Sequence, residues 1–118
     1  MRWEEGRQGT GYLKKKLLES HSWFLFDLYL LKFPEGAYVP PHKDEVGYGL
    51  RHYRVNLILW PAKRGGEFKI DYTNWITVIR PFVNWPFLKI FRPDRLTHSV
   101  TLVEEGTRYV LSLGFVLR

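Results

Sequence analysis

The sequence predicts a mostly β protein of the sandwich or jelly-roll class, with one short helix near its start. Apolar and β-branched runs of strand length follow one another through most of the 118 residues. Turn-forming residues separate these runs at short, regular intervals, which favours a sandwich or a jelly roll. Near the start, Leu13, Leu17 and Leu18 repeat at helical spacing, which predicts a short amphipathic helix over residues 12–19.

The predicted elements follow in order. Residues 1–10 are polar and form an extended lead, and the helix over 12–19 comes next. An apolar strand at 23–33 ends at Pro34, and a strand at 38–44 begins with a Pro-Pro step that holds the backbone extended. Residues 45–53 form a Gly-containing loop of the kind that gates a site. Further strands are predicted at 54–60, 67–72, 75–80, 86–92, 98–103 and 107–117.

The composition indicates a single domain over residues 1–118, long enough to bury a core without disulfides. The absence of cysteine excludes thiolate metal sites and a cysteine nucleophile. Asp27 and Lys32 interrupt the longest apolar run, and no segment resembles a signal peptide. We therefore expect a cytoplasmic protein without a membrane association.

A candidate metal site begins at His42-Lys43-Asp44. On a strand, residues two apart point to the same face, so His42 and Asp44 can reach one ion while Lys43 points away. His98, on another predicted strand, supplies a third ligand. Two imidazoles and one carboxylate form the facial triad that suits non-haem Fe(II) and leaves coordination positions open.

A candidate anion-binding group lies ten residues beyond His98, at Arg108. Glu104-Glu105-Gly106 fits a hairpin loop with Gly106 in the left-handed region. This hairpin predicts that His98 faces Ser112, and that His98 and Arg108 lie on one face of a sheet about 13 Å apart. A short dicarboxylate would fill the gap, with the Arg108 guanidinium gripping its far carboxylate.

These motifs, in this order, resemble the 2-oxoglutarate- and Fe(II)-dependent oxygenases. The resemblance covers roughly residues 24–117 and includes features of the prolyl hydroxylases and of the aspartyl/asparaginyl hydroxylases. Gly36 precedes the His-x-Asp triplet at the position that prolyl hydroxylases use. The other matching segments are Arg54 to Trp60 followed by Gly65 to Phe68, Phe87 to Pro93 leading into His98, and Gly106 to Phe115.

The resemblance implies a double-stranded β-helix fold, a jelly roll of the cupin type. It implies that Fe(II) is held by His42, Asp44 and His98, and that Arg108 fixes the distal carboxylate of 2-oxoglutarate. With O2, such an enzyme hydroxylates a substrate C–H bond and converts 2-oxoglutarate to succinate and CO2. The substrate that the matching segments favour is an amino-acid side chain of a protein or peptide, with a small molecule as the other option.

One departure from the family pattern points to two more residues. Prolyl hydroxylases commonly place a co-substrate-binding tyrosine where this chain has Phe33. Arg54 and Asn56 share one face of their strand by alternation and are predicted to supply the missing contact with 2-oxoglutarate. His52, predicted in the loop beside the metal strand, is a candidate for contact with substrate.

Three other functions stay open. One is a non-enzymatic, cupin-like barrel that holds a metal, and another is a metal-dependent isomerase or dioxygenase that uses no 2-oxoglutarate. The third is an oxygenase acting on nucleic acid, because a net charge of +6 and a pI near 9.7 predict attraction to nucleic acid or to an acidic partner. A homo-oligomer is also possible, since a second copy could complete so small a barrel.

Overall fold

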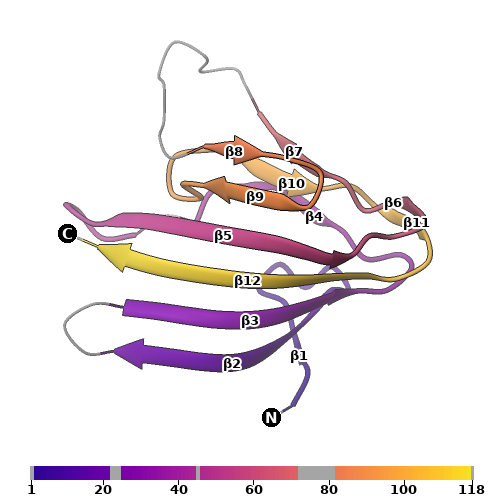
Figure 1. Cartoon of the computed structure of the whole chain (residues 1–118), viewed down its shortest axis with the longest axis horizontal. Helices are drawn as coiled ribbons and strands as arrows, with labels where there is room; N and C mark the ends of the chain where they lie inside the picture. Colours follow the sequence, from indigo (N-terminus) through magenta and orange to yellow (C-terminus); the bar gives the residue numbers. More distant parts are fainter. Residues whose placement is uncertain (1, 22–24, 45, 72–81, 118) are drawn as a thin grey trace.

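Two facing β-sheets and a separate two-stranded ribbon make up the described part of the protein in the computed structural model, which describes residues 2–21, 25–44, 46–71 and 82–117 (Figure 1). The large sheet has the order β1-β2-β3-β12-β5-β9-β8, the small sheet has the order β4-β10-β7, and β11 pairs with β6. The large-sheet strands are β1 (Glu4–Glu5), β2 (Leu13–His21), β3 (Leu25–Phe33), β5 (Arg51–Trp60), β8 (Val83–Asn84), β9 (Leu88–Phe91) and β12 (Arg108–Leu117). The others are β4 (Val39–His42), β6 (Arg64–Gly65), β7 (Phe68–Ile70), β10 (His98–Val100) and β11 (Val103–Glu105).

The chain alternates between the two sheets. It passes from β3 in the large sheet to β4 in the small one, returns to β5, and repeats this exchange through β7, β9, β10 and β12. This exchange is the pattern of a jelly roll. The predicted mostly β fold is confirmed, and the strand predicted at 75–80 lies outside the described residues.

The predicted helix at 12–19 is wrong, because this segment is β2, which pairs with β3 along its length. The register shifts between Lys16 and Leu18, so Leu17 occupies a bulge. The bulge returns Leu18 to the face of Leu13, and a spacing that fits a helix therefore also fits a bulged strand. The long pairing with β3 stabilises the strand over the helix, because tertiary pairing overrides a weak helical pattern. Among the described residues there is no helix, and hence none able to span a membrane.

The predicted hairpin between 98–103 and 107–117 is also wrong. His98 pairs with His42 and Ile70 in the small sheet, whereas Ser112 pairs with Tyr29 and Asn56 in the large sheet. The chain leaves β10, forms β11 against β6, and then crosses to the large sheet. The left-handed position of Gly106 is confirmed, with φ of 86°, but its turn joins two sheets instead of closing a hairpin.

The core fills one end of the space between the sheets. Residues from both sheets and from the segment before β2 form one buried cluster: Tyr12, Phe33, Ala37, Val39, Ile58, Val100, Val103 and Val110. The predicted loop at 45–53 is shorter than expected, because β5 already begins at Arg51. His52 and Tyr53 are therefore strand residues, and His52 points inward, where it is buried.

Candidate metal and anion site

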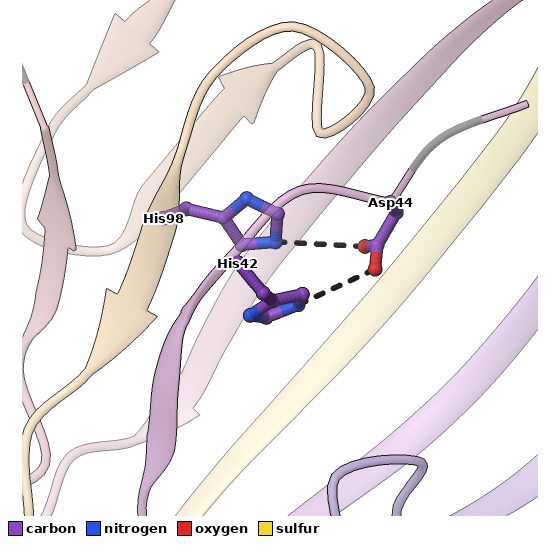
Figure 2. Close-up of side chains that lie close together, drawn as sticks. All are labelled: His42, Asp44 and His98. Atoms are coloured by element: carbon purple, nitrogen blue, oxygen red, sulfur yellow. Dashed lines mark ion pairs between the residues drawn. The ribbon is translucent and has the colours of Figure 1, made fainter.

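The two histidines and the aspartate of the candidate metal site converge at one point (Figure 2). His42 is the last residue of β4 and lies opposite His98 on the neighbouring strand β10. Asp44 follows β4, where its backbone N–H donates to the carbonyl of Pro93 at 2.8 Å. Its carboxylate lies 3.3 Å from His42 Nε2 and 3.5 Å from His98 Nε2. One ligand atom from each residue lies within 4.8 Å of the others.

Both imidazoles are oriented in the same way by their own strands. His42 Nδ1 lies 2.8 Å from the carbonyl oxygen of Pro40, and His98 Nδ1 lies 2.9 Å from that of Leu96. A carbonyl only accepts, so each Nδ1 carries a proton and donates it. In the metal-free protein each Nε2 points toward Asp44 and donates to it when the imidazole is protonated. In the neutral imidazole, Nε2 has a free lone pair instead, which is the state needed to bind a metal.

The charges at this site are coupled. Burial raises the pKa of Asp44, but hydrogen bonds from His42 and His98 outweigh it and hold this pKa far below its ordinary range. The hydrogen bond with Asp44 raises the pKa of His42, against the opposing effect of burial. Asp44 is therefore an anion at neutral pH, and its charge favours a cation at the centre of the three side chains.

The donor set suits a catalytic metal ion. Two nitrogens and one carboxylate are ligands that divalent iron accepts, and three protein ligands leave positions open for other molecules. Among the described residues, no other group of three histidine, aspartate or glutamate side chains is arranged to hold an ion. The sequence-predicted ligands therefore lie together.

A cavity of about 340 Å³ between the two sheets contains this site. The small sheet contributes the two histidines, and the large sheet contributes Arg54, Asn56 and Arg108. Apolar side chains of both sheets complete its wall, among them Phe91, Val100 and Val110. Its volume is in the range of cavities that bind small molecules.

Arg108 is the buried cation of this cavity. Its side chain is only 4% exposed, and its guanidinium lies over the ring of Phe33, with the carbon 4.9 Å from the ring centre. Burial lowers its pKa to about 10, so it is still charged at neutral pH. No carboxylate of the described residues forms an ion pair with it, and burial is the whole cause of its pKa shift. Buried charges usually have a partner, so the position fits an anionic ligand.

Lys89 adds to the positive potential near Arg108. Burial lowers its pKa, and the neighbouring charges of Arg108 and Lys69 lower it further. Its Nζ donates to Asn84 Oδ1 at 2.7 Å. Positive charge near Arg108 attracts an anion such as a carboxylate.

Arg54 has a different environment, although it lines the same cavity. Its Nη2 lies 3.0 Å from Asp27 Oδ1, and its Nη1 donates to Ser112 Oγ at 2.7 Å. Ser112 in turn donates to Asn56 Oδ1 at 2.6 Å. The structure thus brings Arg54 and Asn56 together, as alternation predicted, but it pairs the charge of Arg54 with Asp27.

Gly114 makes room for this network. It is the register partner of Arg54 and Asp27 on the strands flanking β12. A Cβ at residue 114 would lie 2.1 Å from Arg54 Nη2, which is far inside contact distance. The guanidinium therefore lies directly on the backbone of β12.

Three further residues also line the cavity: Tyr12, Asp27 and His52. The ring of Tyr12 stacks on the ring of Phe33, with the ring centres 5.2 Å apart. This contact was not predicted, because residues 12–19 were expected to form a helix. Asp27 could have been found from sequence as a carboxylate inside an apolar strand. His52 Nδ1 is buried without a hydrogen-bond partner among the described residues, so the prediction that it faces the substrate remains a proposal.

Comparisons with known proteins show the fold of this chain. No family model matches, and no curated protein matches. Among solved structures, the chain is similar to the viral collagen prolyl hydroxylase vCPH from Paramecium Bursaria Chlorella virus-1, solved with 2OG. The TM-score is 0.59 at 14% identity, over 90% of this chain and 79% of that one.

Two other solved structures are similar at the same level. KdgF from Halomonas sp. has a TM-score of 0.56 at 18% identity, over 100% of this chain and 88% of that one. A chain from the Rhodobacter sphaeroides SigE complex with the anti-sigma ChrR has a TM-score of 0.52 at 19% identity, over 97% of this chain and 48% of that one. The fold is therefore a jelly roll of the cupin-like type that the hydroxylase and KdgF share.

Proposed function

We propose that this chain is a 2-oxoglutarate- and Fe(II)-dependent dioxygenase. One observation carries the proposal: an open metal triad and a buried guanidinium without a carboxylate partner among the described residues line the same cavity. A dicarboxylate that binds the metal at one end and Arg108 at the other would fill the open metal positions and would give the buried guanidinium an anionic partner. The fold shared with a 2OG-bound hydroxylase supports this assignment.

The residues of the cavity have separate roles in this function. His42, Asp44 and His98 would hold Fe(II), with the Nδ1 bonds fixing both imidazoles. Arg108 would bind the distal carboxylate of 2-oxoglutarate, with its guanidinium packed over the ring of Phe33. Phe91, Val100 and Val110 keep the wall apolar and exclude water.

With Fe(II), 2-oxoglutarate and O2 bound, the chemistry supplied is the hydroxylation of a substrate C–H bond, with 2-oxoglutarate converted to succinate and CO2. The substrate that we propose is an amino-acid side chain of a protein or peptide. The resemblance of the sequence segments to amino-acid hydroxylases and the likeness to a collagen prolyl hydroxylase both support this class. The network of Asp27, Arg54 and Ser112 offers polar groups to such a substrate.

Conversion of 2-oxoglutarate to succinate tests the proposal. We expect the Fe(II)-loaded protein to form succinate slowly without substrate and faster with a pool of peptides. His98→Ala and Arg108→Ala abolish or strongly reduce formation, while Arg51→Ala, on the outer surface, does not. A folded, metal-loaded protein that consumes no 2-oxoglutarate under either condition contradicts the proposal and supports the metal-holding barrel without turnover.

A further inference from the structure

The outer face of the large sheet is apolar across its three central strands. Val110 and Ser112 point into the space between the sheets, so the alternate positions of β12 point outward. Residues that pair directly on neighbouring strands point to the same face of the sheet, so the register also shows which residues of β3 and β5 point outward. The outward residues are Phe26, Leu28 and Leu30 of β3, Tyr109, Leu111, Leu113 and Phe115 of β12, and Tyr53, Val55, Leu57 and Trp60 of β5. We call this set the outer apolar face.

None of these side chains is buried by the described residues. Leu113 is 36% exposed, Leu57 is 42% exposed and Trp60 is 67% exposed. Every member of the buried core cluster lies instead on the inner side of its sheet or in the segments between the sheets. Soluble monomers seldom expose a contiguous apolar patch of this extent, so the face indicates a binding surface.

The face is large enough for a stable interface. The central strands contain nine, ten and ten residues, and Leu18 of β2 with Leu88 and Ile90 of β9 extend the face to five strands. Four strands about 4.8 Å apart and roughly 30 Å long, with the four residues of β9, give a footprint on the order of 600 Å². Stable pairs of proteins bury roughly 600 to 1,000 Å² on each partner.

The charges of the face lie along its edges. Lys15 of β2 lies beside Leu30, with its Nζ 4.9 Å from the ring centre of Trp3. Lys32 lies beside Tyr109 at one end of the sheet, and Arg51 lies beside Leu117 at the other end. A two-fold axis along β12 would place β3 of one copy over β5 of its partner. Lys32, whose Nζ already lies 5.8 Å from the ring centre of Trp3, would then lie near the partner's Trp60 as well and away from its own equivalent, which is a favourable arrangement of a cation and aromatic rings.

We propose that the occupant of the outer apolar face is a second copy of this chain, packed sheet on sheet about this two-fold axis. Such a face is self-complementary, as a symmetric dimer requires. Aligned packing of two twisted sheets brings the two copies of β12 opposite each other. The cavity lies on the inner side of the large sheet, so the dimer leaves it accessible.

The absence of cysteine makes a direct test possible. Leu113→Cys places one thiol at the centre of the face, opposite its own copy in the proposed dimer. We expect rapid crosslinking of this variant by a short bis-maleimide to a product of roughly twice 14.1 kDa. The matched control is Leu102→Cys, which is also exposed, at 50%, but lies between β10 and β11, away from the face; it crosslinks no faster than chance collision allows.

Sedimentation of the unmodified protein provides the second measurement. We expect a dimer at micromolar concentrations, and a monomer for Leu113→Lys and Leu57→Lys, with β circular dichroism retained. A monomeric parent protein overturns the proposal, and so does equal crosslinking of the two cysteine variants. Neither measurement requires iron or 2-oxoglutarate, so this proposal and the proposed oxygenase function succeed or fail separately.

Discussion

His98 and Arg108 belong to different sheets, yet both side chains line one cavity. β10 carries the histidine in the small sheet, and β12 carries the arginine in the large sheet. A ligand that binds a metal at His98 and a carboxylate group at Arg108 would link the two sheets. Binding of such a ligand would therefore be tied to the stability of the whole sandwich.

Arg108→Met is expected to stabilise the ligand-free protein. The pKa of Arg108 falls from its ordinary 12.5 to about 10 because its charged form is buried, and at about 1.4 kcal/mol per pKa unit this is a cost of about 3 kcal/mol. Thermal unfolding should show a higher Tm for the variant, and a smaller further rise than in the parent protein when 2-oxoglutarate is added to the Mn(II)-loaded protein. A lower Tm for the variant would mean that Arg108 already has a stabilising partner.

The pH dependence of stability should reverse when a metal is added. Without metal, the contribution of His42 is present below pH 6.5 and is lost as the pH rises through its raised pKa. The stabilising contribution of Asp44 is present above pH 3.8 and is lost as the pH falls through its lowered pKa. Burial lowers the pKa of His52, which acts in the opposite direction in the same pH range. The prediction is therefore made against His42→Gln: without metal, the advantage in Tm of the parent protein over this variant should be larger near pH 5 to 6 than near pH 8, about one unit on either side of the ordinary histidine value.

Mn(II) should change this order, because metal binding requires neutral imidazoles and strengthens as the pH rises. Tm measured from about pH 5 to about pH 8, with and without Mn(II), gives both curves. His98→Ala serves as the control that removes the response to metal. An advantage of the metal-free parent protein over His42→Gln that is no larger near pH 5 to 6 than near pH 8 would contradict the His42–Asp44 pair.

Gly114→Ala should break the network around Arg54. The new Cβ would occupy the position of the guanidinium, which must move away from Asp27 and Ser112. Loss of a half-buried ion pair and a hydrogen bond predicts destabilisation of about 1–3 kcal/mol, measured by urea unfolding. Gly47→Ala is the matched control, since its Cβ meets only the end of Leu50 at 3.4 Å; an equal loss in both variants would refute the argument.

Arg54→Met should weaken 2-oxoglutarate binding less than Arg108→Met does. Asp27 already neutralises Arg54, whereas Arg108 has no such partner among the described residues. We expect a loss of tenfold or more in affinity for Arg108→Met, on the scale of about 1.4 kcal/mol or more, and a smaller loss for Arg54→Met. Calorimetric titration of the Mn(II)-loaded proteins measures both, and the reverse order would make Arg54 the co-substrate clamp.

Much of the site could be predicted because its signals are local. The spacing of His42 and Asp44 fixes a shared face, and His98 with Arg108 follows in a recognisable order. Their place on one face of a single sheet was predicted from a hairpin that does not form, and the structure instead brings them to one cavity from two sheets. The error arose because a loop of three residues with glycine fits a hairpin and a crossing between sheets equally well, and only long-range pairing decides between them.

The contribution of the amino-terminal segment could not be predicted. The bulge at Leu17 depends on pairing with β3, so the sequence around it fits a helix as well as a strand. Tyr12 reaches the cavity only because this segment is extended and its ring stacks on Phe33. Asp27 is different, because a carboxylate among apolar strand residues was a visible signal of an inward polar site.

The most direct test of the central claim is an anaerobic titration of the Fe(II)-loaded protein with 2-oxoglutarate, followed by visible absorption. The account predicts a weak metal-to-ligand charge-transfer band, which disappears in His98→Ala and requires far more 2-oxoglutarate in Arg108→Ala. A folded, iron-loaded protein that shows no band at saturating 2-oxoglutarate would contradict the account.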